Sequence, residues 1–323
     1  MTPVSWDSRE RGASGAGSLP VAASRGQLQA ELDRLRRGGG TLALVPTMGY
    51  LHPGHLALLD RAASMADHVV LSIFVNPLQF GPGEDLDRYP RSLGRDLELA
   101  STRGAVLAFT PSVQEMYPEG PPRVRVDPGP GGNVLCGAFR PGHFEGVLTV
   151  VARLFGLVRP DVAVFGRKDA QQVALVREMS RDLELGVEID VAPLVREPDG
   201  LAMSSRNAYL SAPEREVAPH LFQALEAADL AFRDGEGRSA ALETRVRDRL
   251  GRSAAEAGGE PVPSFRLEYA QVVDPGTLAR VDDARPGHLL AVAAWLGTTR
   301  LIDNVVLGAD DPDPRIPGPV QEP

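Results

Sequence analysis

The segment Pro46–Leu59 reads PTMGYLHPGHLALL, and it joins a short apolar run, Thr41–Val45, to a helical pattern, His55–Met65. A strand that passes through a Gly- and Pro-containing turn into a helix presents backbone N–H groups and the positive end of the helix dipole at one point. Such a point favours an anion. We therefore predict a strand–turn–helix unit that binds an anionic ligand.

The alternation of strand and helix continues beyond this unit. Further strands are predicted at Val69–Val75, Val106–Thr110, Val162–Phe165 and Val187–Val191, and helices at Ser92–Thr102, Val147–Val158 and Asp169–Leu183. Short apolar strands that alternate with helices are typical of a parallel sheet covered on both faces. The prediction is an α/β, doubly wound, Rossmann-like domain with its ligands at the carboxyl ends of the strands.

The pattern changes after about residue 194. Helical patterns at Pro213–Asp234 and Ser239–Ala257 precede predicted strands at Phe265–Val273, His288–Leu296 and Arg300–Leu307. Helices followed by a run of strands indicate a smaller α+β domain. We therefore divide the chain into a ligand-binding domain over residues 21–194 and a smaller domain over 195–308, with disordered tails over 1–20 and 309–323.

Composition limits the class of protein. A length of 323 residues fits two domains at about 100–200 residues each. The net charge of −9 argues against a general nucleic-acid binder. A single cysteine, Cys136, excludes an internal disulfide framework and suits a reducing compartment. Neither a signal peptide nor an apolar run of membrane-spanning length is present, so we expect a cytoplasmic protein without membrane or nucleic-acid partners.

Two of the six histidines, His52 and His55, fall in the turn that opens the first helix. Three residues apart, both imidazoles can point at one phosphate, and Gly54 lets the backbone pass close to it. Imidazole N–H groups stabilise charge that develops on a phosphate under attack. The alternative is a turn with two incidental histidines, and the strand–turn–helix context argues against it.

A second strand-to-helix turn, FGRKDAQQ at Phe165–Gln172, contains Lys168, the only lysine in the chain. Because arginine occupies every other basic position, a lysine here indicates a place where a compact, flexible ammonium is needed. Chance survival of one lysine on a solvated face is the alternative. Asp169 is as well suited to capping the next helix as to a catalytic role. The amide of Gln172 could bind hydroxyl and carboxylate groups.

Two further loops carry polar groups of the same kind. DGLAMSSRNAYLS, residues 199–211, places Ser204, Ser205 and Arg206 together, where they could hold the outer phosphates of a nucleotide. Taken alone, this segment would favour a solvated loop with an N-cap serine. SIFVNPLQF, residues 72–80, puts Asn76 and Gln79 just after a strand, in the position of a substrate-reading surface.

Together these segments resemble the pantoate–β-alanine ligase family over about residues 20–308. The matching patterns are PTMGxLHxGH, SIFVNPxQF, RPxHFxGVxTVV at Arg140–Val151, GLAxSSRN, and GTTRLIDN at Gly297–Asn304, and they occur in the family's order. The resemblance implies that ATP first converts pantoate into pantoyl adenylate and pyrophosphate. The amine of β-alanine then displaces AMP to give pantothenate. It also implies Mg²⁺ with the ATP and a homodimer.

The resemblance further assigns roles to individual residues. It implies that His52, His55, Lys168 and Arg206 are catalytic, with His55 at the proton-donor position. Gln79 and Gln172 match the pair that holds pantoate, with Asn76 beside them, and Asp96 matches a position associated with the metal. The implied ATP site comprises Pro46, Thr47, Met48, His52, His55, Gly166, Lys168, Asp169, Val195, Met203, Ser204, Ser205 and Arg206.

Three positions depart from the family pattern. Arg95, Cys136 and Arg167 stand where acids are usual. They leave open the alternative that the chain is a paralogue that adenylates a related hydroxy acid or joins it to another amine. A nucleotidylyltransferase that transfers AMP to a phosphate acceptor shares the two-histidine turn, but the SIFVNPLQF segment argues against it. A non-enzymatic protein that binds ATP only for regulation is expected to have lost one of the two histidines or Lys168. All three residues are present.

Overall fold

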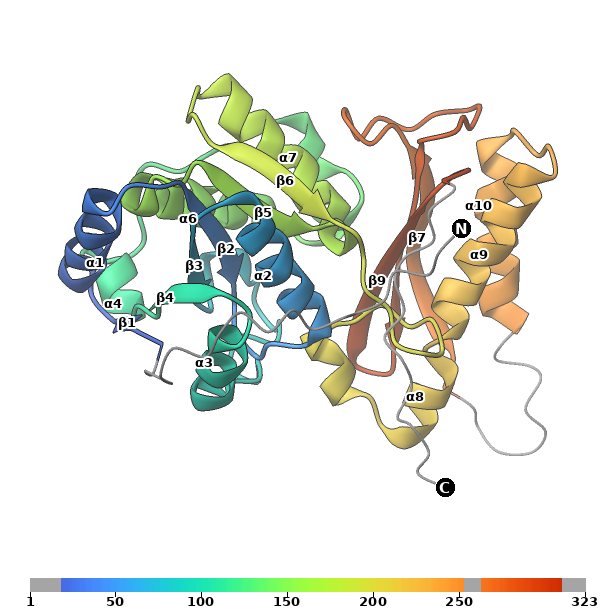
Figure 1. The fold of residues 1–323 in the computed structure, drawn as a ribbon. Helices are drawn as coiled ribbons and strands as arrows, with labels where there is room; N and C mark the ends of the chain where they lie inside the picture. Colours follow the sequence, from blue (N-terminus) through green and yellow to red (C-terminus); the bar gives the residue numbers. More distant parts are fainter. Residues whose placement is uncertain (1–18, 253–262, 310–323) are drawn as a thin grey trace, which may run out of the picture.

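The computed structural model describes residues 19–252 and 263–309. Figure 1 shows two parts side by side, an α/β part built on a parallel sheet and a smaller part built on a second sheet. The predicted tails, residues 1–20 and 309–323, lie almost wholly outside the described residues.

The first part is built on a six-stranded sheet in the order β1-β4-β3-β2-β5-β6, and every pairing is parallel. Its strands are β1 (Val21–Ala22), β2 (Leu42–Thr47), β3 (His68–Ile73), β4 (Ala105–Phe109), β5 (Val162–Gly166) and β6 (Glu188–Ala192). The chain runs outward from β2 through β3 to β4, and then crosses back to β5 on the other side of β2. The strand order therefore reverses between β2 and β5, where a doubly wound sheet opens a crevice for ligands.

Helices cover both faces of this sheet. They are α1 (Arg25–Arg37), α2 (Pro53–Met65), α3 (Leu93–Ser101), α4 (Val113–Met116), α5 (Cys136–Phe139), α6 (His143–Val158) and α7 (Ala170–Asp182). Along β2, Leu42 and Leu44 pack with α1, α6 and α7, whereas Ala43 and Val45 pack with α2 and α3. Because both sides of the strand are apolar and buried, its sequence is a continuous apolar run, as predicted for such a sheet.

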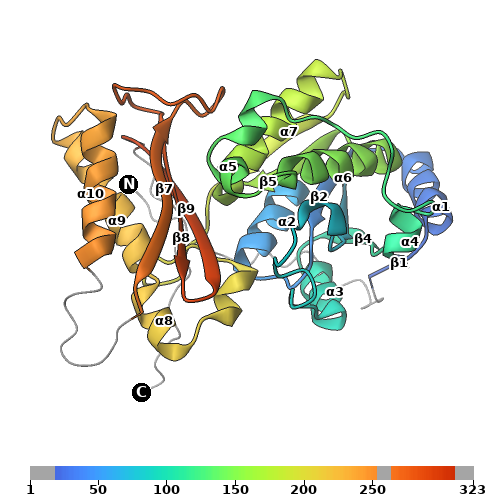
Figure 2. The same cartoon turned by 180° about the vertical axis from the view of Figure 1, so that it is seen from behind.

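The second part is an antiparallel meander of β7 (Phe265–Val273), β8 (Leu289–Leu296) and β9 (Thr299–Val306). Beside it lie α8 (Ala212–Val217), α9 (His220–Arg233) and α10 (Ser239–Arg252). Leu290, Val292 and Ala294 of β8 pack with these helices, and Ala291 and Ala293 join the core of the first part. Seen from behind, the sheet stands between the helices and the parallel domain (Figure 2). The second sheet is thus buried on both faces and forms the wall opposite the first domain.

The predicted fold class, a doubly wound parallel sheet with a smaller α+β part, is confirmed, but some predicted elements differ. The single helical pattern over residues 213–234 is two helices, because Pro219 lacks the N–H that a continuous helix needs and instead forms the N-cap of α9. Helix α1 was not predicted. It has a capping box of Ser24 and Gln27 and an apolar stripe of Leu28, Leu32 and Leu35. The end of the predicted helix at residues 253–257 lies outside the described residues.

Candidate active site

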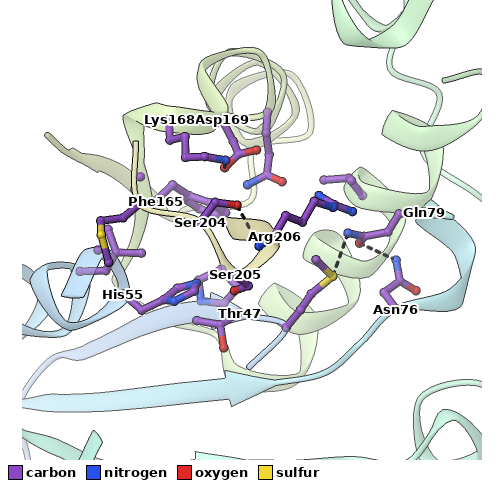
Figure 3. A pocket seen from close by; sticks show the side chains of 18 of the residues that line it. Thr47, His55, Asn76, Gln79, Phe165, Lys168, Asp169, Ser204, Ser205 and Arg206 are labelled. Atoms are coloured by element: carbon purple, nitrogen blue, oxygen red, sulfur yellow. Dashed lines mark hydrogen bonds and ion pairs between the residues drawn. The ribbon is translucent and has the colours of Figure 1, made fainter. Parts of the chain in front are cut away.

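A cavity of about 220 Å³ lies where the carboxyl ends of β2 and β5 face the second domain. In Figure 3, His55, Lys168 and Arg206 lie around one space although they come from three separate segments. The cavity lining contains all the residues predicted for the site except Asp96, namely Pro46, Thr47, Met48, His52, His55, Asn76, Gln79, Gly166, Lys168, Asp169, Gln172, Val195, Met203, Ser204, Ser205 and Arg206.

The turn after β2 is held by buried hydrogen bonds. Gly49 has a φ of 84°, and a Cβ there would lie 2.9 Å from Ile73 Cγ2, so the turn requires glycine. Asp96, which is 1% exposed, accepts hydrogen bonds from the backbone N–H of Tyr50 at 2.8 Å and of Leu51 at 2.7 Å. Both oxygens of Asp96 are therefore used to hold the turn behind the cavity. The prediction that Asp96 is a metal ligand does not fit this position.

The two histidines lie in contact at the start of α2, with ring centroids 4.0 Å apart. The backbone N–H of His52 lies 3.4 Å from His55 Nδ1. Because a main-chain N–H only donates, Nδ1 of His55 accepts, and the neutral ring carries its proton on Nε2. Nδ1 of His52 is buried and has no hydrogen-bond partner among the described residues. A Cβ on residue 54 would come within 3.0 Å of the His52 ring, so Gly54 leaves the space that the ring occupies.

Burial makes both imidazoles neutral at neutral pH. Desolvation, together with the nearby His55 and Lys168, lowers the pKa of His52 to about 2. Desolvation also lowers the pKa of His55 to about 4, with Asp169 opposing and Lys168 assisting. A neutral His55 with its proton on Nε2 is a hydrogen-bond donor that carries no charge. Such a donor can stabilise negative charge that develops nearby.

Lys168 lies in the short turn between β5 and α7, with its side chain 20% exposed. Its Nζ is 4.0 Å from the carboxylate of Asp169, which is half exposed. Asp169 occupies the N-cap position of α7, but its side chain makes no capping hydrogen bond, so the predicted capping role is wrong. The turn is held from the second domain, since Asn304 Nδ2 donates to the main-chain oxygens of Arg167 and Lys168 at 3.1 and 3.0 Å.

The serine–arginine segment closes the cavity from the second part of the chain. Ser204 Oγ accepts from the N–H of Arg206 at 3.2 Å, and Ser205 Oγ lies 3.4 Å from Tyr50 O. The Arg206 guanidinium donates to both oxygens of Asp85, each at 2.8 Å. A planar cation that binds two carboxylate oxygens can bind two phosphate oxygens in the same geometry.

Side-chain amides also line the cavity. Gln79 Nε2 lies 3.2 Å from Met48 Sδ, and its Oε1 accepts from Asn76 Nδ2 at 3.0 Å (Figure 3). Asn76 is 1% exposed, and it also donates to Gly146 O and accepts from Tyr117 Oη. Asn76 thus uses its hydrogen bonds inside the protein. Gln79 and Gln172, which are less buried, present their amides at the cavity.

Three residues at or beside the cavity were not assigned by sequence reasoning. Arg140 and His143 line it, and Asp85 pairs with Arg206 next to it. The signal for the first two was present in the Arg140–Val151 pattern, which combines a rare histidine with an arginine at a helix start. Asp85 had no comparable signal, because its partner lies 121 residues away in the sequence.

The three departures from the family pattern lie around the cavity rather than in its lining. Arg95 donates to Leu51 O at 2.8 Å behind the histidine turn. Cys136 lines a smaller adjoining cavity, where its Sγ lies 3.1 Å from Tyr269 Oη and 3.4 Å from an Arg300 nitrogen. Arg167 contributes its main-chain oxygen to Asn304. None of the three belongs to the lining of the main cavity.

Within residues 19–252 and 263–309, no three His, Cys, Asp or Glu side chains are grouped closely enough to hold a metal ion. In the same ranges, no helix combines the length and the apolar character needed to cross a bilayer.

A doubly wound sheet with two imidazoles, an ammonium and a guanidinium at its switch point is the arrangement of an enzyme site that suits an anionic ligand. The profile of the family described as Pantoate-beta-alanine ligase matches residues 21–306. The chain belongs to this family and is a ligase.

Individual relatives agree with this assignment. A pantothenate synthetase of Thermobifida fusca is 53% identical over 86% of this chain and 93% of its own length. One from Geobacter sulfurreducens is 50% identical over 90% of this chain and 100% of its own. The crystal structure of pantothenate synthetase from Thermus thermophilus is similar with a TM-score of 0.81 and 47% identity, over 89% and 99% of the two chains.

A fourth relative is a solved structure with bound ligands. It is a pantoate-beta-alanine ligase from Francisella tularensis, described as complexed with Beta-gamma ATP and Beta-alanine. It is 30% identical, with a TM-score of 0.73, over 90% of this chain and 98% of that one.

Proposed function

We propose that this chain condenses pantoate with β-alanine at the expense of ATP, through a pantoyl adenylate, and releases AMP and pyrophosphate. The observation that carries the proposal is the convergence of His52, His55, Lys168 and Arg206 on one cavity whose lining also includes Gln79 and Gln172. The first group suits a nucleotide triphosphate, and the amide pair suits a small hydroxy acid.

In the first step, a carboxylate oxygen of pantoate attacks the α-phosphorus of ATP. The bond from that phosphorus to the oxygen bridging the β-phosphate breaks, and pyrophosphate leaves. Negative charge grows on the oxygens around the α-phosphorus and on the leaving group. The Nε2–H of His55 and the ammonium of Lys168 stabilise this charge, and Arg206 holds the outer phosphates.

In the second step, the amine of β-alanine attacks the acyl carbon of the adenylate. The bond from that carbon to the phosphate oxygen breaks, AMP leaves with that oxygen, and the nitrogen loses a proton. A free carboxylate does not react with an amine, because it offers no leaving group. Adenylation removes this obstacle, because AMP is a good leaving group.

Mg²⁺ is part of the proposal as a companion of ATP. The described residues form no cage of their own for a metal, which fits an ion that keeps several waters and binds chiefly to substrate phosphates. The half-exposed carboxylate of Asp169, next to Lys168 at the cavity, is the protein group best placed to meet it. Bound there, the ion would neutralise triphosphate charge.

The direct test is to incubate the purified protein with ATP, Mg²⁺, pantoate and a panel of amines, and to identify AMP and the amide product. We expect AMP and pantothenate in equal amounts, with β-alanine preferred among the amines. AMP formed only with another acid or amine would instead support the paralogue that uses related substrates. A homodimer and a cytoplasmic location stay predictions.

Lys168→Arg tests the lone lysine, because the substitution keeps the charge and changes its shape. We expect adenylation to fall by about 10²- to 10³-fold, the usual cost of losing one well-placed charge-stabilising group. Arg181→Lys, the reverse change at an exposed site on α7, is the matched control and should leave the rate unchanged. Near-normal activity of Lys168→Arg would show that a compact ammonium is not required.

A further inference from the structure

His143, the first residue of α6, makes two hydrogen bonds that fix the state of its ring. Nδ1 lies 2.8 Å from the main-chain oxygen of Gln79, and Nε2 lies 3.0 Å from Nη1 of Arg140. A carbonyl oxygen only accepts and a guanidinium only donates. The ring is therefore neutral, with its proton on Nδ1. Burial lowers the pKa of His143 to about 4, in keeping with a neutral ring.

Arg140 is itself held in place. Its Nε and Nη2 donate to the two oxygens of Glu84 at 2.8 and 2.5 Å, and its remaining nitrogen, Nη1, is the one that reaches His143. The Arg140 side chain is only 12% exposed. The imidazole thus lies against the guanidinium of Arg140, which Glu84 holds in place and neutralises. Its Nδ1–H therefore points at the main-chain oxygen of Gln79.

The group at the end of this chain of hydrogen bonds is Gln79, the last residue of the short helix η1 (Pro77–Gln79). Helix α6 also packs directly on η1, since a Cβ at Gly146, one turn after His143 in α6, would come within 2.3 Å of Leu78 O. The side chain of Gln79 is oriented by Asn76. The main chain of Gln79 is held by His143, with Arg140 Nη2 more distant at 3.4 Å.

We propose that His143 is a positioning residue that orients Gln79 for binding the hydroxy acid, through the hydrogen bond from its Nδ1–H to the Gln79 carbonyl. The inference rests on the proposed role of Gln79 in binding pantoate. His143 transfers no proton in this role. Without the donor, the Gln79 peptide can rotate and its amide leaves the cavity wall, so the affinity for pantoate falls while the nucleotide side stays intact.

Two substitutions separate this role from simple packing. The amide nitrogen of asparagine lies close to the Nδ1 position of histidine, so His143→Asn keeps a donor towards Gln79. His143→Gln places its amide near the Nε2 position, and it keeps contact with Arg140 but loses that donor. We expect the pantoate KM to rise about tenfold in His143→Gln, the loss of one well-made hydrogen bond, and less than about threefold in His143→Asn. The ATP KM should change less than about twofold in both.

Equal pantoate KM values for the two variants, or a parallel rise in the ATP KM, would overturn the proposal. The midpoint of thermal unfolding, measured for each variant, shows whether lost packing explains a change. The proposed function is tested separately by the wild type. If wild-type protein makes no pantothenate, that function fails; if it does and His143→Gln keeps a normal pantoate KM, the positioning role alone fails.

The state of the His143 ring can also be measured directly in the wild-type protein. Long-range ¹H–¹⁵N correlation of the histidine rings at neutral pH should show His143 protonated at Nδ1 and bare at Nε2. The signal is assigned by its loss in His143→Asn. A ring protonated at Nε2, or at both nitrogens, would contradict the hydrogen-bond directions on which the proposal stands.

Discussion

Two arginine–aspartate pairs, formed by Arg196 and by Arg206, are both bidentate but have different surroundings. Arg196 donates to the two oxygens of Asp303 at 2.7 and 3.1 Å. Arg206 donates to the two oxygens of Asp85 at 2.8 Å each. In both pairs, a planar guanidinium meets a carboxylate through two parallel hydrogen bonds.

The surroundings distinguish the pairs. The side chains of Arg196 and Asp303 are 0% and 1% exposed, and Arg196 also donates to two main-chain oxygens and stacks over Phe222 at 3.8 Å. Arg206 and Asp85 are 26% and 13% exposed, and Arg206 lines the cavity. The first pair is a permanent part of the second domain. In the second pair, Asp85 holds the cation at the cavity, where, under the proposed function, a phosphate would replace the carboxylate.

The largest effect is expected from Arg196→Met. Removing one partner of a buried pair leaves the other charge buried and unpaired, which costs about 3–5 kcal/mol. The free energy of unfolding, measured in urea at pH 7, should fall by that amount. Arg181→Met, at a side chain that is 72% exposed, is the control and should change it by less than about 1 kcal/mol. Equal losses of unfolding free energy in Arg196→Met and Arg181→Met would show that burial does not decide how much an arginine contributes to stability.

Arg206→Met should reduce activity strongly and stability only a little. Asp85 lies beside an open cavity and can be hydrated when its partner is removed, so the free energy of unfolding should change by about 1 kcal/mol or less. AMP formation should fall by about 10²- to 10³-fold, because the phosphates lose a bidentate donor. The two quantities are measured on the same preparation. A large loss of stability with normal activity would place Arg206 in the same class as Arg196.

Much of this site follows from local patterns in the sequence. The turns that carry His52, His55 and Lys168 each follow an apolar strand and open a helix. Parallel strands bring their carboxyl ends to one edge, so the two turns had to meet. The site residues could therefore be grouped without knowing any contact. The position of the second domain's strands was less predictable, since the packing of β8 on both cores depends on the whole fold.

The parts that sequence reasoning missed depend on distant partners. The role of Asp96 is decided by two backbone N–H groups about 45 residues earlier in the chain, which no local pattern reveals. Asp85 and Glu84 look like ordinary loop acids until Arg206 and Arg140 are placed beside them. A carboxylate in a sequence can equally well bind a metal, brace a turn or pair with a cation, and only the fold distinguishes these roles.

Asp85→Asn tests whether the cavity pair is exchangeable. If a phosphate displaces Asp85 from Arg206, weakening the pair should lower the ATP KM by about two- to fivefold, the range of a partly exposed ion pair. Asp87→Asn, an exposed acid in the same loop, is the control and should leave the ATP KM unchanged. A rise in the ATP KM would mean that Asp85 is needed to orient Arg206 and is not displaced.

The pH dependence of this pair gives the smallest expected effect. Burial alone would raise the pKa of Asp85, but hydrogen bonds and charge from Arg206 outweigh it and hold the pKa below its usual value of 3.8. A lowered folded-state pKa stabilises the protein above the unfolded-state value, and this contribution is lost as the pH falls through the folded-state pKa.

The difference in unfolding free energy between wild type and Asp85→Asn should therefore be about 1 kcal/mol or less at pH 7. It should stay constant down to about pH 5 and shrink below about pH 4. Urea unfolding at several pH values measures it, and a difference that grows on acidification would contradict the assignment. A saturating non-hydrolysable ATP analogue should reduce the difference even at pH 7, because the phosphate then takes the place of Asp85. The buried pair offers no such exchange, so the analogue should leave the effect of Arg196→Met unchanged apart from the stabilisation that binding itself provides.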